Sequence, residues 1–196
     1  MINKVIRQSL VLASRSPRRA EILQAVGWPF EIMAADIDER LVDGEDAISY
    51  VRRLAERKAK VVAENNLGRL ILGADTTVVI DGQILGQPCD AKDARRMLHL
   101  LKGGWHEVIT GVALVRFGEN ATEIIDHETT HVHFAELSAD EIDWYVSTGE
   151  PMGKAGAYGI QGKAAPFIDE IQGDYFNIVG LPIRLVYELS RQLGGS

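Results

Sequence analysis

Short apolar runs alternate with amphipathic stretches along the chain, and this alternation predicts strands and helices in turn. The runs Leu10–Ala13 and Leu70–Ala74 are apolar, and Thr76–Ile80 is entirely β-branched, so we expect buried strands there. Other stretches place apolar residues three or four positions apart, the period of a helix with one packed face. The sequence predicts further strands at 30–34, 105–116, 121–134 and 168–171, and helices at 17–26, 46–65, 90–101, 138–148 and after Pro182 to about Leu193.

Several predicted boundaries have a clear local signal. Ser138–Glu141 is a capping box, Asp90 can cap the helix that follows it, and Asp81–Gly82 marks a turn. The order of these elements predicts an α/β fold with a mixed sheet and helices on its faces.

The longest predicted helix, 46–65, carries a lysine within its apolar stripe. Lys58 lies seven residues after Val51, so the two share one side of the helix. From this spacing alone we expect Lys58 at the edge of the stripe, with its stem packed and its ammonium in solvent. The apolar members of the stripe are Ile48, Val51, Leu54, Ala55, Val61 and Val62.

An acidic residue, Asp75, interrupts the apolar stretch 70–80. An ionised carboxylate in a core strand is costly unless it is paired or binds a metal, so Asp75 is a candidate general base or metal ligand. Gly73 shares its face of a regular strand, where a glycine leaves room for a ligand. A carboxylate that closes a turn is the weaker alternative, because the turn signal comes later, at Asp81–Gly82.

A hydroxyl-rich turn joins the first predicted strand to the first predicted helix. Residues 14–19 read S-R-S-P-R-R, with Ser16 at the helix N-cap and Pro17 at the first helical position. Arg18 and Arg19 then fall in the first turn, where the helix dipole disfavours cations. Free N–H groups at a helix start bind anions and arginine grips phosphate, so Ser14 and these arginines form a candidate phosphate site. The alternative is a solvated turn with two surface arginines.

Two further clusters carry weaker signals. Asp36, Asp38 and Glu39 form an acidic segment that reads as a solvated loop or as the source of one carboxylate for a divalent cation. His131 and His133 share a strand face and resemble a zinc pair, but no third spaced ligand accompanies them and an ordinary strand is favoured.

Composition narrows the classes of function. The chain has 196 residues, 46% hydrophobic and 25% charged, which suits one soluble domain over 1–196. A net charge of −7 argues against a nucleic acid or an anionic membrane as partner. Cys89 is the only cysteine, so no intrachain disulfide is expected. Neither a leader pattern nor an apolar run of about 18 residues is present, and we expect a cytoplasmic protein.

Four motifs also resemble those of a known family. They are Leu12–Arg19, Arg53–Ala59 (R-L-A-E-R-K-A), Gly73–Thr76 (G-A-D-T) and Gly156–Gly162 (G-A-Y-G-I-Q-G). Together they resemble the Maf family of nucleoside triphosphate pyrophosphatases, and the last is similar to its branch acting on dTTP and UTP. The resemblance runs from about Leu10 to Leu189.

This resemblance implies a role for individual residues. Asp75 matches the family's proposed general base, Lys58 a functional lysine, and Glu39 an acid that helps metal-dependent chemistry. Gln87 stands where the family usually has a lysine, and its amide cannot supply that charge. The substrate would be bound by Ser14, Arg18, Arg19 and Lys58 at its phosphates and by Thr76 and Gln161 at its base.

The resemblance further implies a reaction and an architecture. A nucleoside triphosphate would be hydrolysed between its α and β phosphates, giving a monophosphate and pyrophosphate. Mg²⁺ or Mn²⁺ would be held by Glu39 and by Asp75 where Asp75 is not the base. The fold would have two lobes with a nucleotide cleft between them, and the protein would form a homodimer.

Two other functions remain open at the level of sequence. The substrate of such an enzyme could be a methylated or non-canonical nucleotide, although Gln161 in its Tyr158–Ile160 context argues against this. A nucleotide-sensing regulator, linked to septum formation, is the alternative from a different class. Release of pyrophosphate by the purified protein with metal distinguishes an enzyme from a binder.

Overall fold

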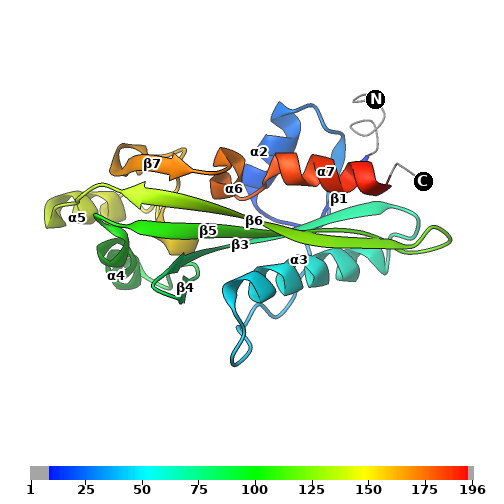
Figure 1. Ribbon diagram of the computed structural model, residues 1–196, viewed down its shortest axis with the longest axis horizontal. Coiled ribbons are helices and arrows are strands. Elements are labelled where there is room, and N and C mark those ends of the chain that lie inside the picture. The colour runs from blue at the N-terminus through cyan, green and yellow to red at the C-terminus, as the bar shows by residue number, and fades with distance from the viewer. Residues whose placement is uncertain (1–8, 194–196) are drawn as a thin grey trace. The chain divides into compact units, whose positions relative to one another are not determined.

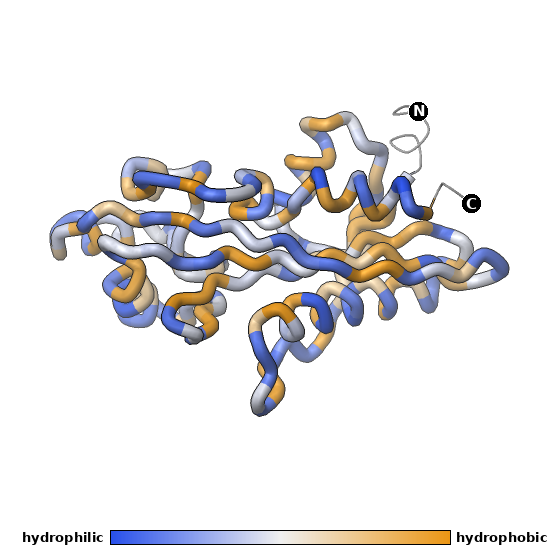
Figure 2. The backbone as a smooth tube through the Cα atoms, viewed as in Figure 1, coloured by the Kyte–Doolittle hydropathy of each residue, from blue (hydrophilic) through white to orange (hydrophobic). Residues whose placement is uncertain are grey.

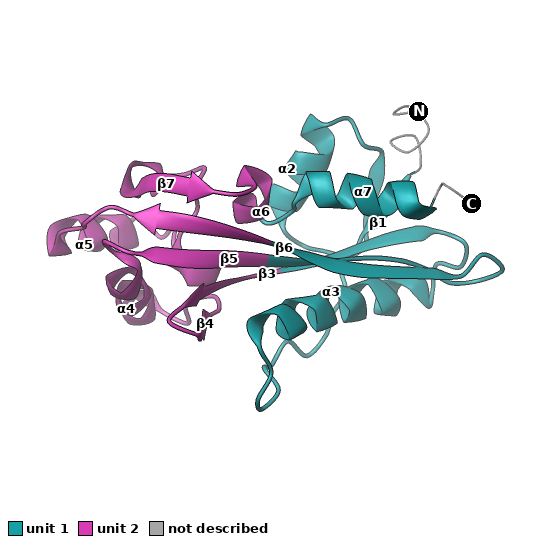
Figure 3. Cartoon of the chain, in the orientation of Figure 1, with its two compact units in different colours: residues 1–75, 110–128, 180–196 teal, residues 76–109, 129–179 magenta. Residues whose placement is uncertain are grey.

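The structure is a computed structural model that describes residues 9–193. The chain divides into two units (Figure 3), the first with residues 1–75, 110–128 and 180–196 and the second with 76–109 and 129–179. Each unit is therefore assembled from segments that are far apart in the sequence. The single domain expected over 1–196 stays a prediction.

Seven strands within residues 9–193 form the mixed sheet that the sequence predicted. They are β1 Leu10–Leu12, β2 Phe30–Ile32, β3 Leu70–Ile80, β4 Gln83–Leu85, β5 Trp105–Arg116, β6 Thr122–Phe134 and β7 Ile168–Gln172. Within residues 9–193 they form a seven-stranded sheet in the order β2-β1-β3-β5-β6-β7, with β4 paired to β3 (Figure 1). β1 pairs in parallel with β2 and β3, whereas β3 is antiparallel to β4 and β6 to β7. The predicted mixed α/β fold is confirmed.

Helices begin where the sequence places their caps. Asp46 accepts a hydrogen bond from Ser49 N at 2.9 Å, Asp90 accepts one from Asp93 N at 2.7 Å, and Ser138 forms the expected capping box. None of the helices within residues 9–193 combines the length and apolar character needed to span a membrane. The helices are α2 Pro17–Ala25, α3 Ala47–Ala63, α4 Ala91–Leu101, α5 Ala139–Ser147, α6 Tyr175–Val179 and α7 Ile183–Leu193.

Two details of the helices differ from expectation. Ser16 occupies the N-cap of α2, but its side chain makes no capping bond, and its backbone N–H donates instead to Ser14 Oγ at 3.2 Å. The segment before the last helix contains the short helix α6, which was not predicted, whereas α7 begins at Ile183, directly after Pro182 as expected. The buried face of α7 includes Leu185, Val186 and Leu189, and Figure 2 shows hydrophobic and hydrophilic positions alternating around its turns.

In the second unit, α4 and α5 contribute to one apolar core. Ala94, Met97, Leu98 and Leu101 of α4 are all buried in this core, as the helical period predicted. β3 returns into β4 through a two-residue turn at Asp81 (φ 50°) and Gly82 (φ 75°), so Ile80 lies opposite Gln83. Two consecutive positive φ angles match the right-handed twist of a hairpin, and Asp-Gly is a favoured pair for such a turn.

In the first unit, the backbone of α3 lies close to the backbone of β3 and β5, with no side chain between them at two glycines. A Cβ atom built on Gly73 of β3 would lie 2.0 Å from the Ala55 carbonyl oxygen, and one on Gly111 of β5 would lie 2.3 Å from that of Val51. Both positions therefore exclude any side chain. Gly73 was expected to leave room for a ligand, and that prediction is wrong, because the backbone of α3 fills the space.

The buried stripe of α3 also differs in part from the predicted one. Ile48 and Val61 are 37% and 39% exposed, so they lie at its margins. Ala59 and Ala63 are fully buried instead, since small side chains fit where the helix backbone lies so close to the sheet. The buried residues of α3 are Val51, Leu54, Ala55, Lys58, Ala59, Val62 and Ala63.

We predict that Gly73→Ala destabilises the protein by about 3 kcal/mol, because overpacking against a backbone atom forces α3 to move. Urea unfolding followed by circular dichroism measures this change. Gly86→Ala is the matched control, since a Cβ atom there meets nothing within 4 Å, and its effect should stay within about 0.5 kcal/mol. Equal stability of Gly73→Ala and the parent would contradict the close packing of α3.

Candidate active site

Asp75 lies in the middle of β3, and its side chain faces α3. The residue is 8% exposed, and its Oδ1 accepts a hydrogen bond from Lys58 Nζ at 2.6 Å. The contact follows from the local sequence. Gly73 and Asp75 share one face of β3, and Gly73 lets the helix that carries Lys58 approach that face.

Lys58 joins two carboxylates. Its Nζ lies 2.6 Å from Asp75 Oδ1 and 2.7 Å from Glu39 Oε1. With its side chain only 11% exposed, Lys58 does not reach out to solvent, so the expectation drawn from spacing alone is wrong. Glu39 comes from the segment between β2 and α3, and its side chain is 52% exposed. The three residues that the sequence singled out as catalytic thus form one ion-paired cluster.

Burial controls the protonation of Asp75. Loss of solvent raises the pKa of its carboxyl group above the ordinary value, and the positive charges of Lys58 and Arg19 oppose that rise without cancelling it. A carboxylate with a raised pKa is a stronger base than one in water. Asp75 is therefore suited to accept a proton while its neighbours keep it in place.

Ser14 and Arg19 are bound to each other beside this cluster. Arg19 Nη1 donates to Ser14 Oγ at 2.9 Å, and Arg19 Nε donates to the carbonyl oxygen of Gly180 at 2.8 Å. Arg19 is buried, at 8% exposure, while Arg18 is partly exposed. Burial lowers the pKa of Arg19, and the nearby charge of Arg18 lowers it further. Two cations close enough to repel each other are the arrangement that an anion stabilises.

Gly180 has a structural part in the site that the sequence did not reveal. Its carbonyl fixes the Arg19 guanidinium although 161 residues separate the two. No local pattern indicates such a contact, because a backbone carbonyl accepts a hydrogen bond whatever its side chain. The positive φ of Gly180, 116°, is the only trace of a special backbone conformation there.

The remaining predicted residues belong to the second unit. Thr76 follows Asp75 directly in β3 and is partly buried, while Gln161 is exposed in the turns after Tyr158. Gln87 is exposed and follows β4. The structure thus brings together Ser14, Arg18, Arg19, Glu39, Lys58 and Asp75, all in the first unit.

The carboxylates of Glu39 and Asp75 fit a divalent cation. Each contacts the Lys58 ammonium through one oxygen, Oε1 of Glu39 and Oδ1 of Asp75, so the two groups lie near each other, and carboxylate oxygens are ligands that Mg²⁺ and Mn²⁺ take. Residues 9–193 hold no group of three or more His, Cys, Asp and Glu side chains that could bind a metal. Two carboxylates suit a cation that completes its shell with water and other oxygen ligands.

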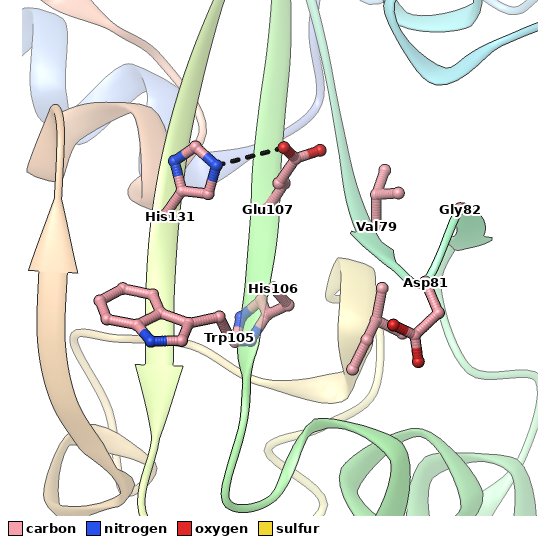
Figure 4. A pocket seen from close by; sticks show the side chains of 8 residues that line it. Val79, Asp81, Gly82, Trp105, His106, Glu107 and His131 are labelled. Carbon is pink, nitrogen blue, oxygen red and sulfur yellow. Dashed lines mark ion pairs between the residues drawn. The ribbon is translucent and has the colours of Figure 1, made fainter.

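A separate pocket of about 320 Å³ lies in the second unit (Figure 4), and none of the predicted site residues lines it. His131 Nε2 pairs there with Glu107 Oε1 at 3.2 Å, whereas His133 pairs with Asp169. The two histidines considered for zinc thus contact different carboxylates. His106 is 2% exposed and bonds to the Tyr158 hydroxyl at 2.8 Å, and burial lowers its pKa to about 3.

Known proteins match almost the whole chain. A family model described as Maf-like protein matches residues 9–193. The dTTP/UTP pyrophosphatase of Symbiobacterium thermophilum is 51% identical over 187 residues, covering 95% of each chain. That of Koribacter versatilis is 47% identical over 194 residues, covering 99% of each. The solved Ham1 protein of Staphylococcus aureus covers 94% of this chain and 99% of its own with a TM-score of 0.54 at 11% identity, which shows a shared fold.

We predict that the parent loses stability relative to Asp75→Asn as the pH rises above about 4. The native pKa of Asp75 is raised above its ordinary value of 3.8, so between the two values the native state binds more protons than the unfolded state. Stability conferred by that proton is lost with rising pH, and a native pKa higher by one is worth about 1.4 kcal/mol. Urea midpoints across this range give the slope. The opposite slope would mean that Lys58 and Arg19 outweigh burial.

Proposed function

The chain belongs to the Maf-like family, and on this basis we propose that it hydrolyses nucleoside triphosphates, dTTP and UTP above all, to the monophosphate and pyrophosphate. One observation carries the proposal: a buried carboxylate, Asp75, is ion-paired to Lys58 in the same unit as the Ser14–Arg19 turn. That unit supplies a base and several cations. Hydrolysis of a phosphoanhydride needs both.

The cations hold the phosphates. Arg19 keeps a fixed orientation through Ser14 and Gly180, and Arg18 lies beside it in the first turn of α2. Ser14 Oγ accepts from Arg19, so its own proton is available for a phosphate oxygen. Lys58 adds a point charge next to Asp75. These groups neutralise the charge of the triphosphate and of the departing pyrophosphate.

Asp75 takes the proton of the attacking water. Burial raises its pKa, and Lys58 holds Oδ1, so the carboxylate has both the basicity and the fixed position of a general base. Glu39 would hold Mg²⁺ or Mn²⁺, and Asp75 would join it as a ligand only where it is not the base. A bound cation supplies Lewis-acid neutralisation of phosphate charge.

Thr76 and Gln161 select the nucleobase in this proposal. The Gln161 amide is exposed and can offer a donor and an acceptor to the edge of a pyrimidine. Thr76 directly follows Asp75, the proposed general base, in β3. We also propose that the protein acts in the cytoplasm as a homodimer, with no nucleic-acid or membrane partner, in keeping with its net charge of −7.

A panel of nucleotides assayed for pyrophosphate release tests the function. We expect turnover of dTTP and UTP in the presence of Mg²⁺ or Mn²⁺, and weaker turnover of purine triphosphates. Preferred turnover of a methylated or non-canonical nucleotide would mean that dTTP and UTP are not the main substrates. Nucleotide binding without any turnover would favour a regulator over an enzyme.

Asp75→Asn should lower turnover of dTTP by about 10²-fold or more, because the amide keeps the shape of the carboxylate but cannot accept the proton. Steady-state kinetics of the folded variant measure the loss. Asp81→Asn is the matched control, since it changes an exposed aspartate of the same hairpin at a positive φ that asparagine tolerates. Near-parental turnover by Asp75→Asn would overturn its assignment as base.

Arg18→Ala and Gln161→Ala should separate phosphate binding from base selection. Phosphate contacts carry no information on the base, so Arg18→Ala should lower kcat/KM for every triphosphate alike. Gln161→Ala should instead change the ratio of kcat/KM between dTTP or UTP and purine triphosphates. If Arg18→Ala altered that ratio and Gln161→Ala left it alone, the two roles are exchanged.

A further inference from the structure

The segment that carries Glu39 has no regular secondary structure. Residues 33–46 lie between β2 and α3, outside every helix and strand of the structure. Glu39 nevertheless lies 2.7 Å from Lys58 Nζ, with half of its side chain open to solvent. An exposed loop carboxylate loses conformational entropy when it is held in one position, so other contacts must fix its backbone.

One face of α3 provides those contacts. Tyr50, Arg53 and Arg57 are spaced three and four residues apart and so lie along one side of the helix. The Tyr50 hydroxyl donates to the carbonyl oxygen of Glu39 at 3.0 Å. Arg53 Nη2 donates to the carbonyl of the next residue at 3.2 Å, and Arg57 Nη1 to that of the preceding residue at 3.4 Å. Three consecutive carbonyls, with that of Glu39 in the middle, are thus bound to α3.

Arg53 makes the most contacts of the three. Besides its bond to the Arg40 carbonyl, its Nε and Nη2 both bind the Glu45 carboxylate at 2.6 Å. Glu45 in turn accepts the backbone N–H of Val42 at 3.2 Å. The side chains of Arg53 and Glu45 are 23% and 10% exposed, so solvent screens this pair less than an ordinary surface ion pair. Arg53 therefore binds the loop at Arg40 and at Glu45, on either side of the turn at residues 43–44.

Tyr50 suits its role as a donor. A tyrosine hydroxyl with its ordinary pKa of about 10 is protonated at neutral pH, so it can donate to the Glu39 carbonyl. The backbone of Glu39 therefore has a permanent donor. The carboxylate itself stays open toward Lys58 and solvent.

We propose that Arg53, assisted by Tyr50 and Arg57, is a positioning residue that fixes the Glu39 carboxylate beside Lys58 and Asp75 and so sets the affinity for the divalent cation. The hydrogen bonds of these three residues within 9–193 go to the loop and not to the side chains of Asp75 or Lys58, so they act through Glu39. The inference rests on the metal role given to Glu39 in the proposed function. Changes in residues that orient a metal ligand lower metal affinity by about 10- to 100-fold.

Binding of Mn²⁺ in the absence of nucleotide, followed by electron paramagnetic resonance, tests this. Arg53→Lys keeps the charge but cannot make the bidentate contact with the Glu45 carboxylate. We expect it to weaken Mn²⁺ binding by about tenfold. Tyr50→Phe removes a single hydroxyl and should weaken binding in the same direction. In turnover assays, both variants should need more metal for half-maximal activity, and kcat should recover as the metal concentration rises.

Arg52→Lys is the matched control. This arginine precedes Arg53 on the same helix but donates to the Ile125 carbonyl at 3.2 Å, so its replacement should leave Mn²⁺ binding unchanged. Glu39→Gln separates the two proposals. If Glu39→Gln weakens Mn²⁺ binding while both Arg53→Lys and Tyr50→Phe bind like the parent, the positioning role is wrong. If Glu39→Gln also binds like the parent, the metal role of Glu39 is wrong and the inference falls with it.

Discussion

The approach of α3 to the strands of the first unit sets the geometry on which the site depends. Helix and sheet are separated by side chains in most packings, but here Gly73 and Gly111 leave the carbonyls of Ala55 and Val51 almost against the strand backbone. At that separation a lysine on the buried face of α3 reaches the carboxylate two residues beyond Gly73. The same helix holds the Glu39 loop with its neighbouring face, so one element positions both carboxylates.

The buried charges of Asp75, Lys58 and Arg19 are stable only because each has a partner. A buried carboxylate or ammonium alone loses its hydration, and neither recovers this cost without the other. Asp75 has Lys58 and the field of Arg19, Lys58 has two carboxylates, and Arg19 has a hydroxyl and a carbonyl. The pKa of Asp75 is raised because burial outweighs the opposing effect of Lys58 and Arg19. A buried carboxylate with a raised pKa is a stronger base than one in water.

Most elements of this fold follow from local physics that a sequence displays. Asp90 and Ser138 begin helices because their side chains accept the free N–H groups there, and Asp-Gly forms the hairpin turn because both residues tolerate positive φ. Asp75 was recognisable as a candidate site residue because an ionised carboxylate in an apolar strand is costly unless it has a partner. The partners of these groups were not predictable in the same way. The spacing of Lys58 fits a solvent-facing lysine equally well, and the contact of Arg19 with the Gly180 carbonyl depends on tertiary structure alone.

That last contact has a consequence for the order in which the protein matures during synthesis. Arg19 leaves the ribosome early, but the carbonyl that orients it is added 161 residues later. At about 5–20 residues per second, the interval is on the order of ten to thirty seconds. Throughout that time the first unit lacks the segment that includes Gly180 and α7. A nascent chain therefore carries Arg19 long before it can hold that side chain in place, and the contact forms only after Gly180 has been added.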